Sequence, residues 1–290
     1  AVLCQCRGDW AFYKGVFNFP AWNARDSMCW YCSASQVTMR DGSASAIWRS
    51  HRKGPNDLLQ ELRAKGVRPC PLFSIRLFHV LMVLVDWLHT MDLGVAATTL
   101  GSFFWECLEF FPGSKQNKLA GLWEAMQLYY DRHPECSKLQ GLTLEMIKQD
   151  GKKPKMRGKA SQVKSLVGFA VEMAERYFTQ GIHNQTVKAV LLQLGFLYSS
   201  LRVTPWPRHE VATASRKLML LYSALAAEQT QAGQDKLWQL KPKFHLMQEL
   251  LEYVAQTQGS PADYWTYAGE DFGAWLTEIG ARRGGAKTPV

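Results

Sequence analysis

The chain has 290 residues, of which 47% are hydrophobic and 20% are charged, and this composition excludes a disordered protein. Its 34 Lys and Arg residues against 25 Asp and Glu residues give a net charge of +9. This charge favours an anionic partner such as nucleic acid, but it also fits an ordinary basic surface. Seven unevenly spaced cysteines do not make a secreted disulfide scaffold, so we expect reduced thiols in a nuclear or intracellular protein.

The chain starts with a predicted strand over residues 1 to 7, and Asp9 follows it after a glycine. An aspartate after glycine commonly binds the backbone amides of a turn, and for this residue alone the turn is the favoured interpretation. A carboxylate at the end of a strand can also hold Mg²⁺ for attack on a phosphate. Because the chain begins within what reads as a strand, we expect it to be a fragment of a longer protein.

Cys29 and Cys32 lie in the motif MCWYC, within an aromatic segment from about residue 10 to 46 that is predicted to be a loop region. Two thiolates at this spacing can share a tetrahedral zinc ion. One C-x-x-C motif is half of such a site, so the other ligands must come from elsewhere in the fold. Cys4 and Cys6 are candidates, although a strand could also bury both as small apolar residues.

The rest of the chain is predicted to be helical. A short helix begins after Asn56 and ends at Gly66. Apolar residues then recur three to four positions apart in seven further segments, which are residues 77–110, 117–131, 160–179, 185–201, 210–230, 242–257 and 262–280. The most apolar of these segments is interrupted by Asp86, His89 and Asp92, so we expect a core helix there and no membrane span.

Asp86 and His89 are three positions apart in the sequence DWLH, so on a helix they share one face. This arrangement suits metal ligation. It also suits a structural hydrogen bond between the two side chains, which is the more frequent role of an isolated pair. Because thiolates and imidazole are ligands that zinc prefers, we expect Cys29 and Cys32 to bind a structural zinc with His89 as third ligand and Asp86 beside it.

A lysine-rich segment with Pro and Gly, KQDGKKPKMRGKASQVK, separates two predicted helices. It is predicted to be an exposed, mobile loop. A solvated linker is one interpretation, and a surface that follows the backbone of DNA is the other. The candidate DNA-binding residues are Lys152, Lys153, Lys155, Arg157, Lys159 and Lys164.

Two further acids and one histidine lie near the end of the chain. Glu270 and Asp271 are surrounded by aromatic residues in YWTYAGEDFGAW, where a buried carboxylate is costly unless it binds a metal or a cation. His245 lies on an otherwise apolar helix face and is interpreted as a hydrogen-bonded core residue.

In order along the chain, the segments RGDWAFYKGVFNFPAWN…MCWYCSA, DWLHTMDLGVA and KPKFHLMQELLEYVAQTQGSPADYWTYAGEDFGAW resemble the transposase core of cut-and-paste DNA transposons of the Plavaka and Kyakuja/Dileera/Zisupton kind, which are related to CACTA elements. That family has an RNase H-like fold in which two Asp and one Glu bind catalytic Mg²⁺. A helical insertion separates the second Asp from the Glu.

The resemblance implies a mostly α fold with a small β part, as a truncated RNase H-like core that carries a large helical insertion. It implies a partial core over residues 1–50, the insertion over 51–240, and the C-terminal helices of the core over 241–290. Asp9 would be the second catalytic Asp, Glu270 the catalytic Glu, and DWLH the Asp-or-Cys, two residues, His signature of the insertion. Asp271 departs from the family, which usually carries Arg there.

The leading hypothesis is therefore a fragment of a DDE-type transposase that performs Mg²⁺-dependent DNA strand cleavage and strand transfer. It is expected to be inactive alone, because no residue before Asp9 can replace the first catalytic Asp. The alternative is a zinc-stabilised helical DNA-binding or scaffold module without catalysis, and a third possibility is a helical protein-interaction domain. The first two predict DNA as a partner, and the sequence leaves a homo-oligomer open.

Overall fold

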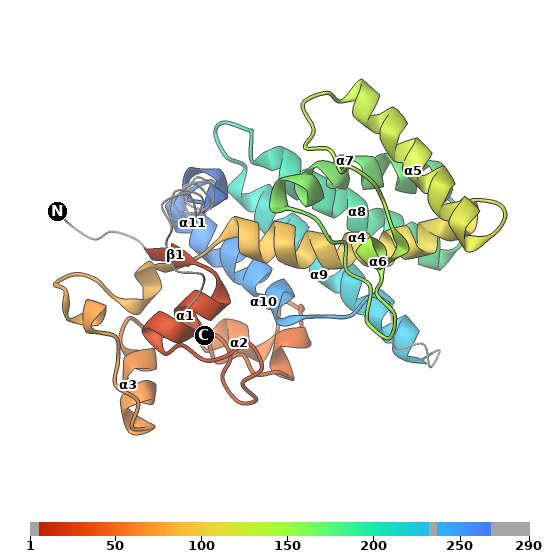
Figure 1. Cartoon of the computed structure of the whole chain (residues 1–290). Helices are drawn as coiled ribbons and strands as arrows, with labels where there is room; N and C mark the ends of the chain where they lie inside the picture. Colours follow the sequence, from red (N-terminus) through yellow and green to blue (C-terminus); the bar gives the residue numbers. More distant parts are fainter. Residues whose placement is uncertain (1–5, 232–236, 268–290) are drawn as a thin grey trace, which may run out of the picture.

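The computed structural model describes residues 6–231 and 237–267, and it is mostly helical with one small parallel sheet (Figure 1). The predicted fold class, mostly α with a small β part, is therefore confirmed. Cys4, Glu270 and Asp271 lie outside the described residues, as does most of the helix expected over 262–280.

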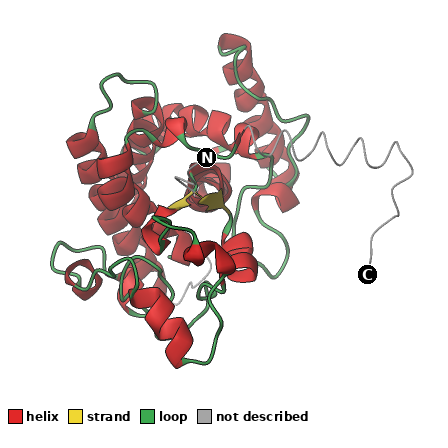
Figure 2. Ribbon diagram, turned by 90° about the vertical axis from the view of Figure 1, so that its left-hand side faces the viewer, coloured by secondary structure: helices red, strands yellow, loops and turns green. Residues whose placement is uncertain are grey.

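The sheet pairs β1 (Cys6–Gly8) with β2 (Val83–Val85) in parallel, in a register that places Gly8 opposite Val85. Figure 2 shows this pair surrounded by helices. The three β2 residues are all buried, as expected for a strand covered on both faces. The prediction of one helix from residue 77 is wrong at its start, because a short 3-10 turn and strand β2 come first and the long helix begins only after Asp86.

Asp9 ends β1 and starts helix α1 (Trp10–Phe17), because its carboxylate accepts a hydrogen bond from the Phe12 amide at 2.6 Å. The helix buries Trp10, Tyr13 and Phe17, which lie on one face, and it ends at Asn18 in the left-handed conformation. The loop expected from residue 10 is thus wrong over these eight residues. A helix this short shows too few turns for its period to be recognised in the sequence.

Short elements connect α1 to β2 and make up the lower left part of Figure 1. The helix predicted after Asn56 is confirmed as α3, although Asn56 makes no side-chain capping bond. The elements are η1 (Thr38–Arg40), α2 (Ile47–Ser50), α3 (Asp57–Ala64), η2 (Pro71–Ser74) and η3 (Val80–Met82).

The helices after β2 follow the predicted periods closely and pack into one layered bundle (Figure 1). The π-helical η4 continues directly into α4, and α8 packs between α7 and α9. Their bounds are η4 (Leu88–Ala96), α4 (Ala97–Cys107), η5 (Leu108–Phe110), α5 (Lys115–Arg132), α6 (Leu144–Ile147), α7 (Ala160–Tyr177), α8 (Ile182–Ser200) and α9 (Arg208–Gln231).

Helix α10 (Pro242–Glu249) connects the bundle to the N-terminal region, since it packs against η4, α9 and η1. Pro242 supplies a suitable first residue, and all residues from Phe244 to Glu249 are buried. The chain continues through η6 (Leu250–Val254), α11 (Ala255–Gln258) and η7 (Pro261–Asp263). Among the described helices, none is both long and apolar enough to cross a membrane.

The lysine-rich segment between α6 and α7 is held against α4 by its backbone. The Met156 amide donates to the Ala97 carbonyl at 2.7 Å, and the Met156 side chain is buried. A Cβ atom added at Gly101 would lie 2.4 Å from the backbone nitrogen of Lys155, so only glycine permits this approach. The segment therefore packs against α4 through its backbone and exposes its lysine side chains.

Candidate metal centre

Cys29 and Cys32 lie in a tight turn whose backbone is tied to the strand-like segment around Arg52. The Lys53 amide donates to the Tyr31 carbonyl at 2.8 Å, and Cys32 pairs with Arg52 in an antiparallel bridge. The Tyr31 amide points at the Cys29 sulfur at 3.3 Å, which favours a thiolate there. Both cysteines are fully buried and are free of disulfides.

Helix α10 supplies two further polar side chains to the same place. His245 and Glu249 are one helical turn apart, so both project from one face toward the two thiols. Their side chains have no exposed surface. Two segments more than 200 residues apart in the sequence therefore place two thiols, one imidazole and one carboxylate in a buried cluster.

The distances in this cluster fit a tetrahedral zinc site. The Cys32 sulfur lies 3.3 Å from His245 Nε2, and Glu249 Oε1 lies 3.4 Å from the same nitrogen and 3.6 Å from the Cys29 sulfur. All four ligand atoms lie within 4.8 Å of one another. Zinc bonds of about 2.0–2.3 Å place tetrahedral ligand atoms about 3.3–3.8 Å apart, so little movement is needed to admit the ion.

The charges of the cluster are also balanced for zinc. Arg52 binds Glu249 through both guanidinium nitrogens, at 2.9 and 2.7 Å. Two thiolates and one carboxylate carry three negative charges, which a Zn²⁺ ion and one guanidinium neutralise. Because a net charge in a fully buried site is costly, this balance favours retention of the ion.

Without an ion, the same groups neutralise one another. Burial favours the neutral Cys29 thiol, but hydrogen bonds from Cys32 and His245 outweigh it and lower the pKa of Cys29 to about 6. The hydrogen bond to Cys29 and burial raise the pKa of Cys32. Burial lowers the pKa of His245, but contacts with Cys29 and Glu249 outweigh it and raise this pKa to about 9. Burial raises the pKa of Glu249, but contacts with His245 and Arg52 outweigh it and lower this pKa to about 2. The lowered pKa favours the thiolate form of Cys29, which is the form that binds zinc.

This geometry suits a structural metal more than a catalytic one. All four positions around the ion would be filled by protein atoms, whereas a catalytic zinc keeps a position open for water or substrate. The cluster is closed to solvent and joins the N-terminal turn to α10. Zinc here would stabilise the contact between these two parts of the chain.

The candidate cluster contains His245 where His89 was expected, and His89 and Asp86 are bound to each other. His89 Nδ1 lies 2.7 Å from Asp86 Oδ2, and the His89 amide donates to the same oxygen. Thr266 adds bonds from its amide and hydroxyl, each at 2.9 Å. The carboxylate of Asp86 therefore lies at the start of the helix after β2 and binds Thr266, while His245 lies beside the thiols.

His245 had a signal in the sequence that the apolar surroundings concealed. It forms an H-x-x-x-E pair with Glu249, and residues four positions apart share a helix face. A buried histidine and a buried glutamate on one face need a common partner, which can be a metal. Cys6, by contrast, lies in β1 and takes no part in the cluster.

Asp9 and Asp86 follow the two paired strands and line one small cavity, together with His89 and Lys243. Asp9 is half-buried, and within the described residues its carboxylate accepts one hydrogen bond, from the Phe12 amide. Asp9 thus makes the capping bond that its position after Gly8 predicts. Glu270, the other expected catalytic acid, lies outside the described residues.

The six candidate DNA-binding residues do not form one group. Lys152, Lys153, Lys155, Arg157 and Lys159 expose their side chains along the segment held against α4. Lys164 instead lies on α7, and its ammonium is 4.4 Å from the ring centre of Trp265. This cation–π contact makes Lys164 part of the packing of the C-terminal segment.

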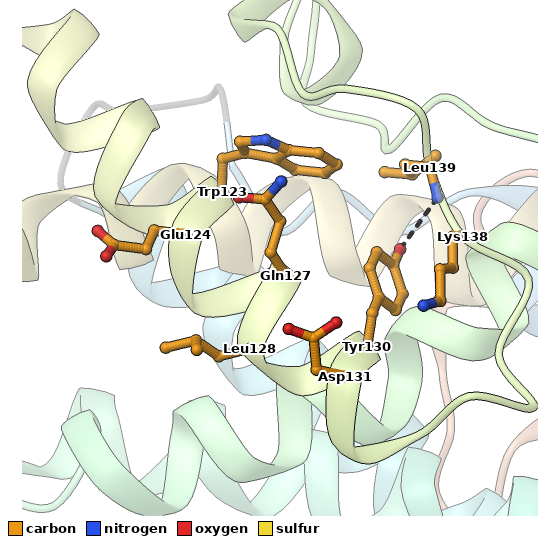
Figure 3. A pocket seen from close by; sticks show the side chains of 8 residues that line it. All are labelled: Trp123, Glu124, Gln127, Leu128, Tyr130, Asp131, Lys138 and Leu139. Carbon is orange, nitrogen blue, oxygen red and sulfur yellow. Dashed lines mark hydrogen bonds between the residues drawn. The ribbon is translucent and has the colours of Figure 1, made fainter.

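Another pocket, of about 420 Å³, lies beside α5 (Figure 3). Its lining mixes the acids Glu124 and Asp131 with Lys138, and the Tyr130 hydroxyl accepts a bond from the Leu139 amide at 3.3 Å. No metal-ligating group of side chains lies in it among the described residues. We assign it no function.

Comparison of the chain with protein-family models found no match, and comparison with curated proteins found none. The function of the chain therefore has to be inferred from its own geometry.

Proposed function

We propose that this chain is a core fragment of a DNA transposase, with an RNase H-like centre stabilised by zinc. The observation that carries the proposal is that the three segments resembling the transposase family meet in space. Cys29 and Cys32 of the first segment lie against His245 of the third. Asp86 of the second segment is bound by Thr266 of the third. A family motif made of distant segments is meaningful only if those segments converge.

The position of Asp9 supports the same proposal. The carboxyl ends of two adjacent parallel strands lie at one edge of a sheet, and here Asp9 and Asp86 follow these ends. Strand-end carboxylates are suitable ligands for Mg²⁺, and Mg²⁺ would stabilise the charge on the attacking and leaving oxygens during DNA cleavage and strand transfer. We propose Asp9 as one catalytic acid and Glu270 as another.

We expect the chain alone to cleave no DNA. Two-metal chemistry needs several carboxylates with free oxygen atoms. Asp86 already accepts four hydrogen bonds from His89 and Thr266, which leaves Asp9 as the more available carboxylate of this cavity. One available carboxylate supports weak binding of Mg²⁺ or Mn²⁺ and no efficient catalysis.

The second candidate function is a zinc-stabilised helical DNA-binding or scaffold module without catalysis. The observation that favours it is that both strand-end acids have structural roles. Asp9 caps α1, and Asp86 holds the start of η4 and Thr266. The metal cluster and the exposed lysines would serve this function equally well.

Iron-directed cleavage of the protein backbone distinguishes the two functions. Fe²⁺ that occupies a magnesium site reduces added hydrogen peroxide to hydroxide and a hydroxyl radical, added ascorbate regenerates Fe²⁺, and the radicals cut the polypeptide beside the bound ion. For the zinc-loaded protein, a transposase core predicts cuts near Asp9 and Asp86, suppressed by excess Mg²⁺ and absent in Asp9→Asn. Asp26→Asn, at an exposed acid, is the matched control and should keep the cuts. Cuts that survive Asp9→Asn, or no cuts at these positions, would contradict the transposase proposal. The non-catalytic module would then be the remaining candidate function.

DNA is the partner proposed for both functions. If the exposed lysines of the segment held against α4 contact phosphates, affinity should fall steeply with salt, by about one counterion per contact. Electrophoretic mobility of duplex DNA at increasing salt measures this slope. Equal affinity at low and high salt would argue against DNA as the partner.

A further inference from the structure

A pocket of about 480 Å³ lies between the lysine-rich segment, the start of α10 and the loop after α1. We call it the lysine–tryptophan pocket. Its size falls within the range of about 300–1,000 Å³ that is usual for ligand sites. Its lining contains no acidic residue. Its tryptophans and lysines are Trp10, Trp22, Lys153, Lys155, Lys241 and Lys243.

Several distant parts of the fold build this pocket. Lys155 is placed by backbone contacts with Ile147 and Gly101, and Lys153 lies two residues before it in the same segment. Lys243 passes over η4 at Gly94, where an added Cβ would lie 2.4 Å from the Lys243 Cδ atom. Its ammonium group donates to the carbonyl of His89 at 2.6 Å. The lysines are therefore gathered by the fold itself.

The protein offsets the positive charge of the pocket only in part, through Asp9 and Asp86, which share the adjoining small cavity with Lys243. Within the described residues, none of its four lysines forms a salt bridge with an acid. Burial, together with repulsion from Lys155 and Lys153, lowers the pKa of Lys241 to about 8. Gathering like charges costs stability, and an anion bound from outside would recover that cost.

The two tryptophans have different roles. Trp10 is largely buried, donates to the Pro20 carbonyl at 2.9 Å and packs against Trp30, so it forms a wall. Trp22 is 58% exposed, which is unusual for the largest aromatic side chain. An exposed indole beside a cluster of lysines offers a surface on which a nucleic-acid base can stack.

We propose that the lysine–tryptophan pocket binds one nucleotide of single-stranded DNA, with its phosphate among the lysines and its base against Trp22. This inference rests on the proposal that the chain binds DNA. A base within a duplex is already stacked between its neighbours, whereas an unpaired base is free to stack on an indole. A carboxylate-bearing peptide would use the lysines but would leave the face of Trp22 without a partner.

The test compares single-stranded and duplex DNA. Fluorescence anisotropy of a labelled oligothymidylate of about 12 nucleotides measures the affinity for the single strand. Trp22→Ala should weaken that affinity by about 5- to 100-fold, and Trp22→Phe, which keeps an aromatic face, should retain most of it. Both variants should bind duplex DNA nearly as the parent chain does. Because Trp22 is exposed, these variants should fold normally.

The lysines are tested by the salt dependence of binding to the same oligonucleotide. Lys241→Gln should reduce the slope of log affinity against log salt by about 0.7, as expected for loss of one phosphate contact on a single strand. Lys217→Gln, at an exposed position on α9 away from the pocket, is the matched control and should leave the slope unchanged.

The possible outcomes separate this inference from the proposed function. If Trp22→Ala and Lys241→Gln bind the single strand like the parent chain while duplex binding persists, the pocket proposal is overturned and the proposed function stands. If inorganic phosphate displaces the oligonucleotide and Trp22→Ala has no effect, the pocket is a phosphate site only, which also overturns the nucleotide proposal. If the parent chain binds neither single-stranded nor duplex DNA, both proposals fail.

Discussion

The spacing of Cys29 and Cys32 indicated a shared candidate metal site, but it did not indicate the side chains that lie beside them. Local spacing shows which side chains share a turn or a helix face, and it correctly places Asp86 beside His89. It does not show which helix packs against which turn. His245 lies beside the thiols because α10 packs against the N-terminal region. This tertiary contact joins segments more than 200 residues apart in the sequence.

Replacing the two candidate histidines one at a time tests the ligand assignment. His245→Gln should remove bound zinc and lower the free energy of unfolding by roughly 3 to 5 kcal/mol, because a buried site loses a ligand and its charge balance. His89→Gln should keep stoichiometric zinc, since His89 binds Asp86. Metal analysis and urea unfolding of both variants provide the measurement. Zinc that is lost in His89→Gln and retained in His245→Gln would refute the assignment.

His183 gives the stability of the bundle a pH dependence. Its two ring nitrogens lie 3.1 Å from Glu106 and 2.8 Å from Glu228, and these acids raise the pKa of His183 to about 9. A pKa raised above the unfolded value of about 6.5 adds stability that is fully present below pH ~6.5 and is lost as the pH rises through about 9.

His183→Gln should therefore cost roughly 1 to 2 kcal/mol of unfolding free energy at pH 6 and much less at pH 10. Urea unfolding at both pH values measures this difference. His209→Gln, at an exposed histidine, is the control and should show no such change. A cost for His183→Gln that is equal at both pH values would show that the histidine acts through packing alone.

At the scale of elements, the sequence predicted the long helices well and the short elements poorly. Helices α5, α7, α8 and α9 span five turns or more, so their apolar period is sampled several times. Helix α1 and strand β2 are too short for any period to appear. The lysine-rich segment was expected to be mobile, because its composition is that of a linker and only tertiary contacts reveal that α4 holds it.

A pair of glycine substitutions tests how this segment is held. Gly101→Ala should destabilise the fold by about 1 to 3 kcal/mol, because the new methyl group meets the backbone of Lys155. It should also weaken DNA binding, since the segment must move. Gly15→Ala, in α1 with no atom within 4 Å of the added Cβ, should instead stabilise by about 0.5 to 1 kcal/mol. Thermal unfolding of both variants measures these changes in stability. A Gly101→Ala variant as stable as the parent chain would show that the segment is not packed as described.

At the scale of the whole molecule, composition and charge predicted the broad class, and the mostly helical fold agrees. The arrangement of the parts was not predictable, because it depends on contacts that no local pattern records. The metal cluster joins the N-terminal turn to α10, while α7, α8 and α9 pack against one another through apolar residues of the common core. The expected units over residues 1–50, 51–240 and 241–290 stay a prediction.

Removal of zinc should therefore loosen one part of the molecule and spare another. Hydrogen exchange of the zinc-loaded and chelator-treated protein should show faster exchange in residues 28–34 and in α10 after chelation. Protection in α8 should change little, because this helix packs mainly against α7 and α9 and contributes no side chain to the cluster. Uniform loss of protection would mean that zinc holds the whole fold, and no change would mean that the cluster needs no metal.

The most direct test of the central claim is X-ray absorption at the zinc edge of the zinc-loaded protein. The four-ligand centre of Cys29, Cys32, His245 and Glu249 predicts two sulfur neighbours at about 2.3 Å and two nitrogen or oxygen neighbours at about 2.0–2.1 Å. Cys29→Ser should reduce the sulfur neighbours to one. A zinc ion surrounded by nitrogen and oxygen alone, or a sulfur count unchanged in Cys29→Ser, would contradict the account.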